Sequence, residues 1–268
     1  MRSPTPKRHH KAARLLLVAA ALLVTGGLYA VVAPATSVAA PTPEETVARG
    51  QELFAVSCAS CHGLNGEGAG LLNETAPSLI GVGAASVDFQ MRTGRMPMAN
   101  PYAQAPNKQN TFTAEEIAAI SLYVASLGDG PAIPDPGQYD PSGLSAAEVA
   151  VGGDLFRTNC SACHNFQGSG GALPNGRVAP PLLDAEPIDI HEAMRTGPGE
   201  MPVFADGAIP DKDVRSMIAY LEQVHAQPSA GLTLGGLGPV SEGFWGWVAG
   251  LGILMLFATW ITKKAARK

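Results

Sequence analysis

An internal repeat divides the middle of this 268-residue chain into two similar segments. The segments are offset by about 102 residues and share the same order of positions over about 80 residues. The shared positions of the first segment are Gly50, Phe54, Cys58, Cys61, His62, Ala76, Pro77, Leu79, Met91, Arg92, Thr93, Gly94, Met96 and Pro97. Those of the second are Gly152, Phe156, Cys160, Cys163, His164, Ala179, Pro180, Leu182, Met194, Arg195, Thr196, Gly197, Met201 and Pro202. This shared order indicates a duplicated domain, so the fold must contain two similar units.

Apolar residues within each copy follow a helical spacing. Val47, Gly50 and Phe54 predict an amphipathic first helix that leads into the first cysteine pair. Each copy ends in a second helix-like segment, at residues 114–127 and 211–224, whose apolar residues fall on one face. No convincing alternation of strand type is present, so we predict small, all-helical domains.

Proline- and glycine-rich segments separate the two predicted domains from each other and from the chain ends. Four prolines between residues 129 and 145 exclude regular helix there, and we predict a semi-rigid spacer. The expected order is therefore a linker at 34–46, a first domain at 47–128, the spacer at 129–145, a second domain at 146–226 and a linker at 227–243.

Two uncharged apolar runs flank the repeat. Residues 15–33 form a run of 19 and residues 244–261 a run of 18, each about long enough to cross the hydrocarbon core of a bilayer as a helix. The first run also fits a cleavable signal peptide, with small residues near Ser37, but its length favours a retained anchor. The expected segments are a basic leader and transmembrane helix (or signal peptide) at 1–33, a transmembrane helix at 244–262 and a basic tail at 263–268.

Charge is unevenly distributed along the chain. All 23 acidic residues but only nine of the 18 basic ones lie between the two apolar runs, so this middle part carries a net charge of −14. Basic flanks stay in the cytoplasm, so we expect a multi-pass cell-membrane protein with both termini cytoplasmic and the repeated domains on the extracytoplasmic side. A middle part this acidic argues against nucleic-acid binding.

All four cysteines fall in two Cys-x-x-Cys-His motifs, at residues 58–62 and 160–164. This is the pattern of covalent c-type haem attachment. Two thiols one helical turn apart form thioethers with the two vinyl groups of one porphyrin, and the adjacent histidine lies under the iron as its proximal ligand. We therefore predict two covalently bound haem c groups, attached through Cys58, Cys61, Cys160 and Cys163, with His62 and His164 as iron ligands.

Other interpretations of the cysteine pairs are a disulfide, a redox-active dithiol or a zinc site. The first two ignore the histidine that follows each pair, and all three ignore the methionines downstream. Two motifs inside aligned repeats leave little room for any of them.

Methionine is the expected sixth iron ligand, because His/Met ligation is common in electron-transfer cytochromes c and raises the haem potential. Only Met96 and Met201 recur before proline on a loop well downstream of the motif, so we assign them as the distal ligands. Met98 is the main alternative in the first copy, although it has no counterpart in the second. Three other methionines are expected in the core: Met91, Met194 and Met217.

Few other residues suggest chemistry. His191 and His225 have no counterpart in the other copy and are expected to be polar surface residues. Arg92 and Arg195 do recur, and they either pair with haem propionates or lie solvated at the surface. No catalytic Ser/His/Asp or Cys/His pairing, phosphate loop or dinucleotide fingerprint is evident, so no catalytic residue is predicted.

The order of motifs in each copy resembles that of class I cytochromes c. Residues 58–68 read Cys-x-x-Cys-His-Gly-x-x-Gly-x-Gly, followed by Pro-x-Leu, Met-Pro and a last helix that contains Tyr123 or Tyr220. The second copy departs from this pattern at Asn165-Phe166. The whole layout resembles the dihaem cytochrome c subunit of the actinobacterial cytochrome bc1 complex, also called cytochrome cc. We therefore expect an all-α fold of two tandem class I cytochrome c domains with an N-terminal and a C-terminal transmembrane helix.

The resemblance implies the electron-transfer subunit of a quinol–cytochrome c reductase (a translocase), without an independent catalytic site in this chain. Its implied partners are the cytochrome b subunit, the Rieske iron–sulfur subunit and an aa3-type cytochrome c oxidase. Electrons would pass from the Rieske protein through two His/Met haems to that oxidase. Two alternatives stay open, a dihaem subunit of a cbb3-type oxidase and a stand-alone membrane-anchored electron carrier. We also hypothesise that extra residues at 99–111 of the first copy dock a partner.

Overall fold

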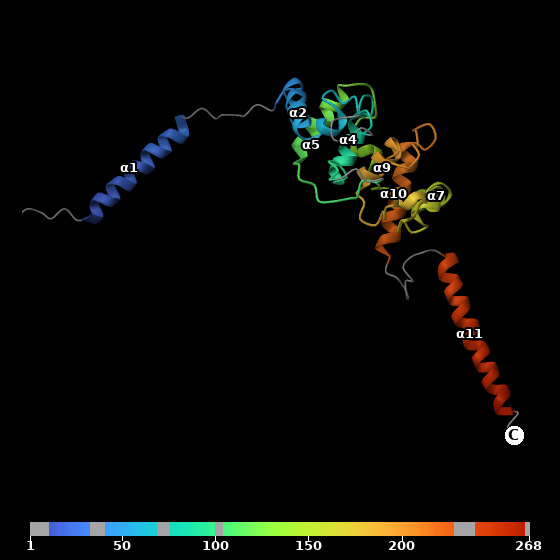
Figure 1. The fold of residues 1–268 in the computed structure, drawn as a ribbon. Coiled ribbons are helices and arrows are strands. Elements are labelled where there is room, and N and C mark those ends of the chain that lie inside the picture. Colours follow the sequence, from blue (N-terminus) through green and yellow to red (C-terminus); the bar gives the residue numbers. More distant parts are fainter. Residues whose placement is uncertain (1–10, 33–40, 69–75, 100–103, 228–238, 266–268) are drawn as a thin grey trace, which may run out of the picture. The chain divides into compact units, whose positions relative to one another are not determined.

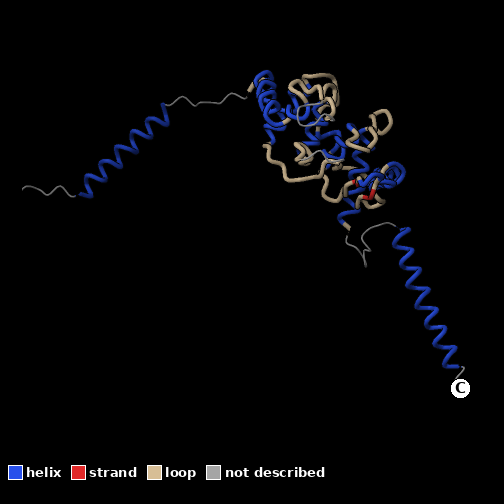
Figure 2. The backbone as a smooth tube through the Cα atoms, viewed as in Figure 1, coloured by secondary structure: helices blue, strands red, loops and turns tan. Residues whose placement is uncertain are grey.

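The computed structural model describes residues 11–32, 41–68, 76–99, 104–227 and 239–265. The chain separates into two compact units, Met1–Thr42 and Pro43–Lys268. Helices make up most of the described part of the chain (Figures 1 and 2). This confirms the predicted helical class.

Two long apolar helices lie near the chain ends, α1 (Lys11–Val32) and α11 (Pro239–Ala265). The segments Ala13–Val31 and Glu242–Ala265 are long and apolar enough to cross a membrane, and no part of either is buried inside the protein. In the last turn of α11, Lys264 Nζ lies 5.0 Å from the ring centroid of Trp260. An amphipathic ring beside a cation suits the boundary between membrane and water. The expected cleavage region near Ser37 lies outside the described residues.

The described part of the first repeated domain contains the helices α2 (Pro43–Ser57), α3 (Ala59–His62), α4 (Gly83–Arg92) and α5 (Ala114–Ala125). Helix α2 begins at Pro43, so part of the segment expected as a linker is helical. Its Gly50 faces α5, where an added Cβ would overlap the carbonyl group of Ala119. The rings of Phe54 and Tyr123 pack beside this crossing, with centroids 5.2 Å apart. The recurring glycine and aromatic residues therefore set how closely the first and last helices of the domain approach.

The second domain repeats this arrangement. Its main helices are α7 (Ala146–Asn159), α8 (Ser161–His164), α9 (Pro187–Thr196) and α10 (Asp211–Ala226). Gly152 lies against the backbone of Ser216, and the rings of Phe156 and Tyr220 have centroids 5.8 Å apart. The same contacts in both copies support the duplication inferred from the repeat.

Each domain has its own hydrophobic core. The core residues of the first domain are Leu53, Phe54, Ala59, Val87, Met91, Ile117, Ala119, Ile120, Tyr123 and Val124. Those of the second are Phe156, Met194, Ile209, Val214, Met217, Ile218 and Leu221. Met91, Met194 and Met217 are therefore buried, as predicted for core residues.

Two local features differ from the expectation of helices joined by irregular linkers. The proline-rich spacer contains a one-turn helix, α6 (Pro136–Tyr139), because Pro136 occupies the first helical position, where no backbone N–H is required. A short antiparallel hairpin, β1 (Gly171–Ala172) with β2 (Val178–Ala179), follows the second cysteine motif (red in Figure 2). Its tip is a 3₁₀ turn, η1 (Pro174–Gly176).

The two repeated domains contact each other within the second unit. Helix α4 packs against α9, its counterpart in the second copy. The side chain of Gln104 pairs with the backbone of Val178 on β2, with its Nε2 2.7 Å from the carbonyl oxygen and its Oε1 2.9 Å from the amide nitrogen. The described part of the loop at 99–111 therefore docks on the chain's own second domain, which was not predicted. Residues 100–103 of this loop lie outside the described residues.

Candidate haem-attachment sites

The cysteine pairs lie on short helices that directly follow the first helix of each domain. In the first copy, the backbone nitrogens of Cys61 and His62 lie 3.1 and 3.0 Å from the carbonyl oxygen of Cys58. The corresponding distances to the Cys160 carbonyl are 3.1 Å from Cys163 and 2.9 Å from His164. One helical turn therefore holds both thiols and the histidine of each motif, as attachment to a single porphyrin requires.

Each motif histidine is oriented by a proline carbonyl group. His62 Nδ1 lies 2.9 Å from the carbonyl oxygen of Pro77, and His164 Nδ1 lies 3.0 Å from that of Pro180. A carbonyl oxygen only accepts hydrogen bonds, so each Nδ1 carries the proton and each Nε2 keeps its lone pair for a metal. Sequence reasoning did not assign this role to the prolines, although their recurrence at equivalent positions was the signal.

Backbone hydrogen bonds tie the glycine segment after each motif histidine to the segment around its proline. In the first copy, Gly68 N donates to the His62 carbonyl oxygen and Leu79 N to the Gly66 carbonyl oxygen, each at 2.7 Å. Gly68 has φ +88°, and a Cβ there would meet the backbone of residues 76–78. Glycine is therefore required where this loop passes under the Ala-Pro segment.

The second copy closes the same loop from a different sequence. Leu182 N donates to the Gly168 carbonyl oxygen at 2.7 Å. Asn165 takes the positive φ of Gly63, at 65° against 80°. Asparagine tolerates this region better than most residues, and its Oδ1 accepts from Phe166 N at 2.6 Å. The Asn165-Phe166 departure therefore leaves the loop intact.

The electrostatics of the thiols disfavour a reactive dithiol. Burial raises the pKa of Cys58 and of Cys160 to about 11, and the second cysteine of each pair adds to this effect. Redox-active cysteines need a lowered pKa so that the thiolate forms. Within the described ranges, no three His, Cys, Asp or Glu residues cluster as a metal-binding group.

Burial also acts on the second motif histidine. It lowers the pKa of His164, and the hydrogen bond to Pro180 opposes this effect. A lowered pKa favours the neutral imidazole, which is the form that binds a metal.

The two methionines assigned as distal ligands are each placed against the core of their own domain. Met96 packs on the first core and donates its N–H to the Gln90 carbonyl oxygen at 2.9 Å. Met201 packs on the second core. Met98 is partly buried without joining the first core, and its aligned residue Val203 is 60% exposed. These positions favour Met96 over Met98, and both ligand assignments stay predictions.

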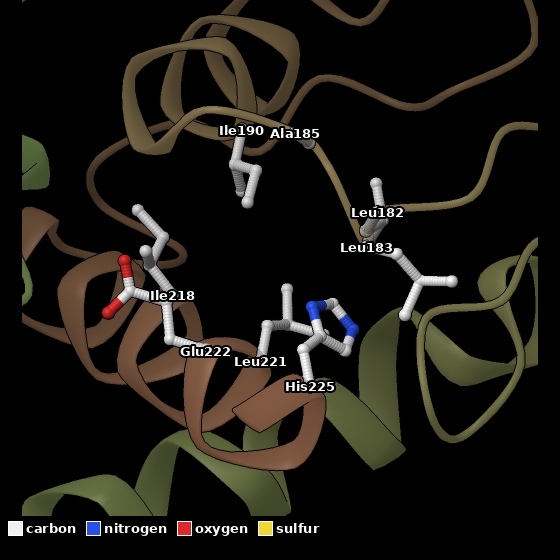
Figure 3. Close-up of a pocket in the computed structure, with 8 residues that line it drawn as sticks. All are labelled: Leu182, Leu183, Ala185, Ile190, Ile218, Leu221, Glu222 and His225. Atoms are coloured by element: carbon white, nitrogen blue, oxygen red, sulfur yellow. The ribbon is translucent and has the colours of Figure 1, made fainter. Parts of the chain in front are cut away.

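A cavity of about 220 Å³ lies in the second domain, between α9, α10 and the segment after Pro180 (Figure 3). The side chains of Leu182, Ile190, Ile218 and Leu221 form its apolar walls, and Glu222 and His225 also line it. Its volume is below the range of pockets that enclose typical small-molecule ligands.

His191 and His225 are not the solvated surface residues that we predicted. His191 is buried, 3% exposed, and its Nε2 lies 2.8 Å from Asp211 Oδ1. His225 is half-buried, and its Nε2 lies 3.0 Å from the Gln167 carbonyl oxygen. Both histidines have partners more than 15 residues away in the sequence, so their own sequence surroundings did not reveal them.

The two recurring arginines are engaged by protein groups, and neither lies solvated at the surface. Arg195 donates to the carbonyl oxygens of Phe204 and Ile209 at 2.8 and 2.9 Å, and to Asp211 Oδ1 at 2.5 Å. Arg92 instead pairs with carboxylates of the second domain. The same position in the two copies therefore has two different structural roles.

Two helical domains, each with a Cys-x-x-Cys-His turn and a histidine oriented for metal binding, define a c-type cytochrome with two cytochrome c domains. Comparison with protein families agrees. The cytochrome c family matches residues 47–128, and the family of subunit III of cbb3-type cytochrome c oxidase matches residues 147–221. The two motifs, Cys58/Cys61 and Cys160/Cys163, therefore imply haem c.

Similar proteins identify the family more closely. The cytochrome bc1 complex cytochrome c subunit of Corynebacterium efficiens is 41% identical over 235 residues, which cover 82% of this chain and 77% of the relative. That of Mycobacterium leprae is 42% identical over 249 residues, which cover 90% of this chain and 84% of the relative. The chain belongs to the family of cytochrome c subunits of the cytochrome bc1 complex. It is a subunit of that enzyme complex, which functions in electron transfer.

A more distant similarity concerns the alternative that the sequence left open. The cbb3-type cytochrome c oxidase subunit FixP of Bradyrhizobium diazoefficiens is 27% identical over 190 residues, which cover 66% of this chain and 60% of the relative. The bc1 relatives match more of the chain at higher identity. The bc1 assignment is therefore favoured over the cbb3 alternative.

Proposed function

We propose that this chain carries electrons, one at a time, from the Rieske iron–sulfur protein of the bc1 complex to an aa3-type cytochrome c oxidase. The observation that carries the proposal is the presence, in one chain, of two cysteine turns whose histidines each donate Nδ1–H to a proline carbonyl. Two redox sites in series allow one domain to receive an electron and the other to deliver it.

The residues that would hold the cofactors follow from this geometry. Cys58 and Cys61 would attach the first haem c, with His62 and Met96 as its axial ligands. In the second domain the corresponding residues are Cys160, Cys163, His164 and Met201. Haem c supplies a one-electron iron couple when bound. Because protein side chains fill both axial positions in this proposal, the chain acts as a carrier and needs no substrate pocket of its own.

We further propose that α1 and α11 both span the membrane, with both termini in the cytoplasm and the two haem domains outside. Basic residues lie at the start of α1 and at the end of α11, on the sides that face the two chain termini. The chain between the two helices carries a net charge of −14. A chain anchored at both ends keeps its haem domains close to the membrane complexes. The cytochrome b subunit, the Rieske subunit and the oxidase are therefore its proposed neighbours.

Purification of the tagged protein from native membranes in mild detergent tests this function. Subunit identification and an optical spectrum are obtained on the same sample. Cytochrome b, a Rieske protein and an aa3-type oxidase, recovered together with a c-type spectrum, are the expected result. Recovery with a haem–copper subunit but without a Rieske protein would favour the cbb3-type alternative. Recovery of the chain alone would favour a stand-alone carrier.

A further inference from the structure

The contact between the two domains is made by helices that occupy the same position in the two copies. Helix α4 presents Asp88 and Arg92, and α9 presents Asp189 and Glu192. Acidic residues outnumber basic ones here, although the side chains are largely withdrawn from solvent. Such a surplus of buried carboxyl groups is costly unless some of them are paired or protonated.

Arg92 is the cation that joins the domains. Its Nη2 lies 2.6 Å from Glu186 Oε2 and 3.2 Å from Asp189 Oδ1, both in the second domain. Its side chain is 28% exposed and that of Asp189 is 15% exposed. The pair with Asp189 is therefore largely shielded from water, where an ion pair is stronger than at the surface.

Asp88 and Glu192 are the most deeply buried acids at this contact, 7% and 0% exposed. Within the described part of the chain, neither oxygen of Glu192 has a hydrogen-bond donor. Asp88 Oδ2 likewise accepts no hydrogen bond, although Arg92 Nε lies 3.4 Å away. The two carboxyl groups interact electrostatically with each other. A proton between them is the donor that would satisfy both.

We propose that Asp88 and Glu192 share one proton across the α4–α9 contact and that this proton, together with Arg92, fixes the relative position of the two haem domains. The three side chains are positioning residues for electron transfer between the domains. This inference rests on the proposed function, in which both domains carry haem.

The acid–base properties of the cluster agree with a shared proton. Burial raises the pKa of Glu192 to about 9, and the neighbouring Asp88 raises it further, against the opposing effect of Arg92. Burial also raises the pKa of Asp88, which Arg92 again opposes. At neutral pH the proton therefore stays on Glu192 while the domains are in contact.

Other titratable groups lie on α4, on α9 and on the helices that pack against them. Arg95 follows α4. Burial lowers the pKa of Arg95, and the negative charge of Asp189 opposes this effect. Helix α5 has two charged residues, Glu115 and Glu116, both in its first turn beside the N-cap Thr113. On α6 the titratable residue is Tyr139, and the acid at the start of α10, Asp211, binds His191 and Arg195.

A second contact between the two domains is made by the 99–111 loop of the first domain and β2 of the second. The amide group of Gln104 both donates to and accepts from the backbone of Val178, as a paired strand would. Lys108, in the same loop, donates to the Gly94 carbonyl oxygen at 2.8 Å. The loop is thereby anchored to the first domain just beyond α4 while it holds the hairpin of the second. Two separate contacts restrict rotation of one domain against the other more than either alone.

The direction of the pH dependence follows from the raised pKa. The domain contact binds the proton more tightly than separated domains do, so the contribution of this proton to the contact is greatest below the ordinary carboxyl pKa. It weakens as pH rises towards about 9. With that value, the equilibrium constant for contact falls on the order of a hundredfold between about pH 7 and 10.

The test uses the full-length, haem-loaded protein with spin labels at Leu122→Cys on α5 and Val151→Cys on α7, both at exposed positions. Distances between the labels are measured by pulsed electron paramagnetic resonance with the haems reduced. Wild type should give one narrow distribution at about pH 6 and an additional longer, broader one at about pH 10. Glu192→Gln, which keeps the shape and a donor, should stay narrow at both pH values. Arg92→Gln should be broad at both, and the surface control Arg49→Gln should behave as wild type.

The rate of electron exchange between the two haems is the second measurement. It should fall several-fold in wild type at high pH and stay constant in Glu192→Gln. A narrow wild-type distribution at high pH, or equal broadening in Glu192→Gln, would overturn the shared proton while leaving the proposed function intact. A protein that is purified without two haems would instead contradict the proposed function.

Discussion

His62 Nδ1 lies 2.9 Å from the carbonyl oxygen of Pro77, and this bond leaves the lone pair of the other ring nitrogen available to a metal. The proline carbonyl belongs to a loop that returns 15 residues after the histidine. The same relationship between His164 and Pro180 shows that each copy of the repeat carries its own complete histidine support. We therefore expect the two predicted attachment sites to be independent of each other and removable one at a time.

Removal of one cysteine pair should halve the haem c content. Cys58→Ser with Cys61→Ser should abolish attachment in the first domain and leave the second loaded. Cys160→Ser with Cys163→Ser should have the reverse effect, and the fourfold variant should bind no haem covalently. Pyridine haemochrome spectra per mole of protein measure this ratio. An unchanged haem content in either double variant contradicts independent attachment.

Met96→Leu should lower the reduction potential of one haem, because a thioether ligand raises that potential. Met98→Leu is the matched control and should leave both potentials unchanged. Met201→Leu should act on the other haem, with the core variant Met194→Leu as its control. Spectroelectrochemical titration resolves the two potentials. A lower reduction potential in Met98→Leu but not in Met96→Leu would identify Met98 as the distal ligand in place of Met96.

Gly50→Ala should destabilise the first domain by about 1–3 kcal/mol, because the new Cβ overlaps the Ala119 carbonyl and forces α2 away from α5. Gly152→Ala should do the same in the second domain, at the Ser216 backbone. Gly137→Ala, where an added Cβ meets nothing within 4 Å, is the control. Thermal unfolding, followed by circular dichroism, compares the three. Equal melting temperatures for Gly50→Ala and the control would contradict the claim that Gly50 is needed for the close packing of α2 on α5.

Asp211 should contribute to acid sensitivity of the second domain. Partial burial alone would raise its pKa, but hydrogen bonds from Arg195, Gln138 and His191 lower the pKa to about 2. The carboxylate therefore stabilises the fold above its ordinary pKa, and this contribution is lost as pH falls through about 2. A shift of this size corresponds to about 2 kcal/mol.

Asp211→Asn should accordingly lower the free energy of unfolding at neutral pH and reduce the loss of stability between about pH 4 and 2. Asp154→Asn, at a side chain that is 79% exposed, is the surface control. Urea titrations over this pH range provide the measurement. If the free energy of unfolding changes with pH in Asp211→Asn as it does in wild type, the Asp211 contacts contribute little to stability.

The two cytochrome c domains and their cysteine turns could be predicted from the sequence because the pattern of a Cys-x-x-Cys-His turn is local. Five consecutive residues bring two thiols and one imidazole onto one helical turn, whatever the rest of the chain does. Helical spacing and buried methionines were equally visible, since Met91 and Met194 recur beside the same glycine. The two long apolar helices, α1 and α11, could be recognised from their length and composition without any knowledge of packing.

Long-range partners could not be predicted in this way. Arg92 and Arg195 occupy the same position in the repeat, yet Arg92 binds acids of the other domain and Arg195 binds a loop of its own. His191 is buried against Asp211, and Gln104 pairs with Val178, 74 residues away. The contacts of Arg92 depend on how α4 packs against α9, and those of His191 and Arg195 depend on how α9 packs against the rest of the second domain. That packing is the sum of many weak, non-local interactions, and no short stretch of sequence encodes it.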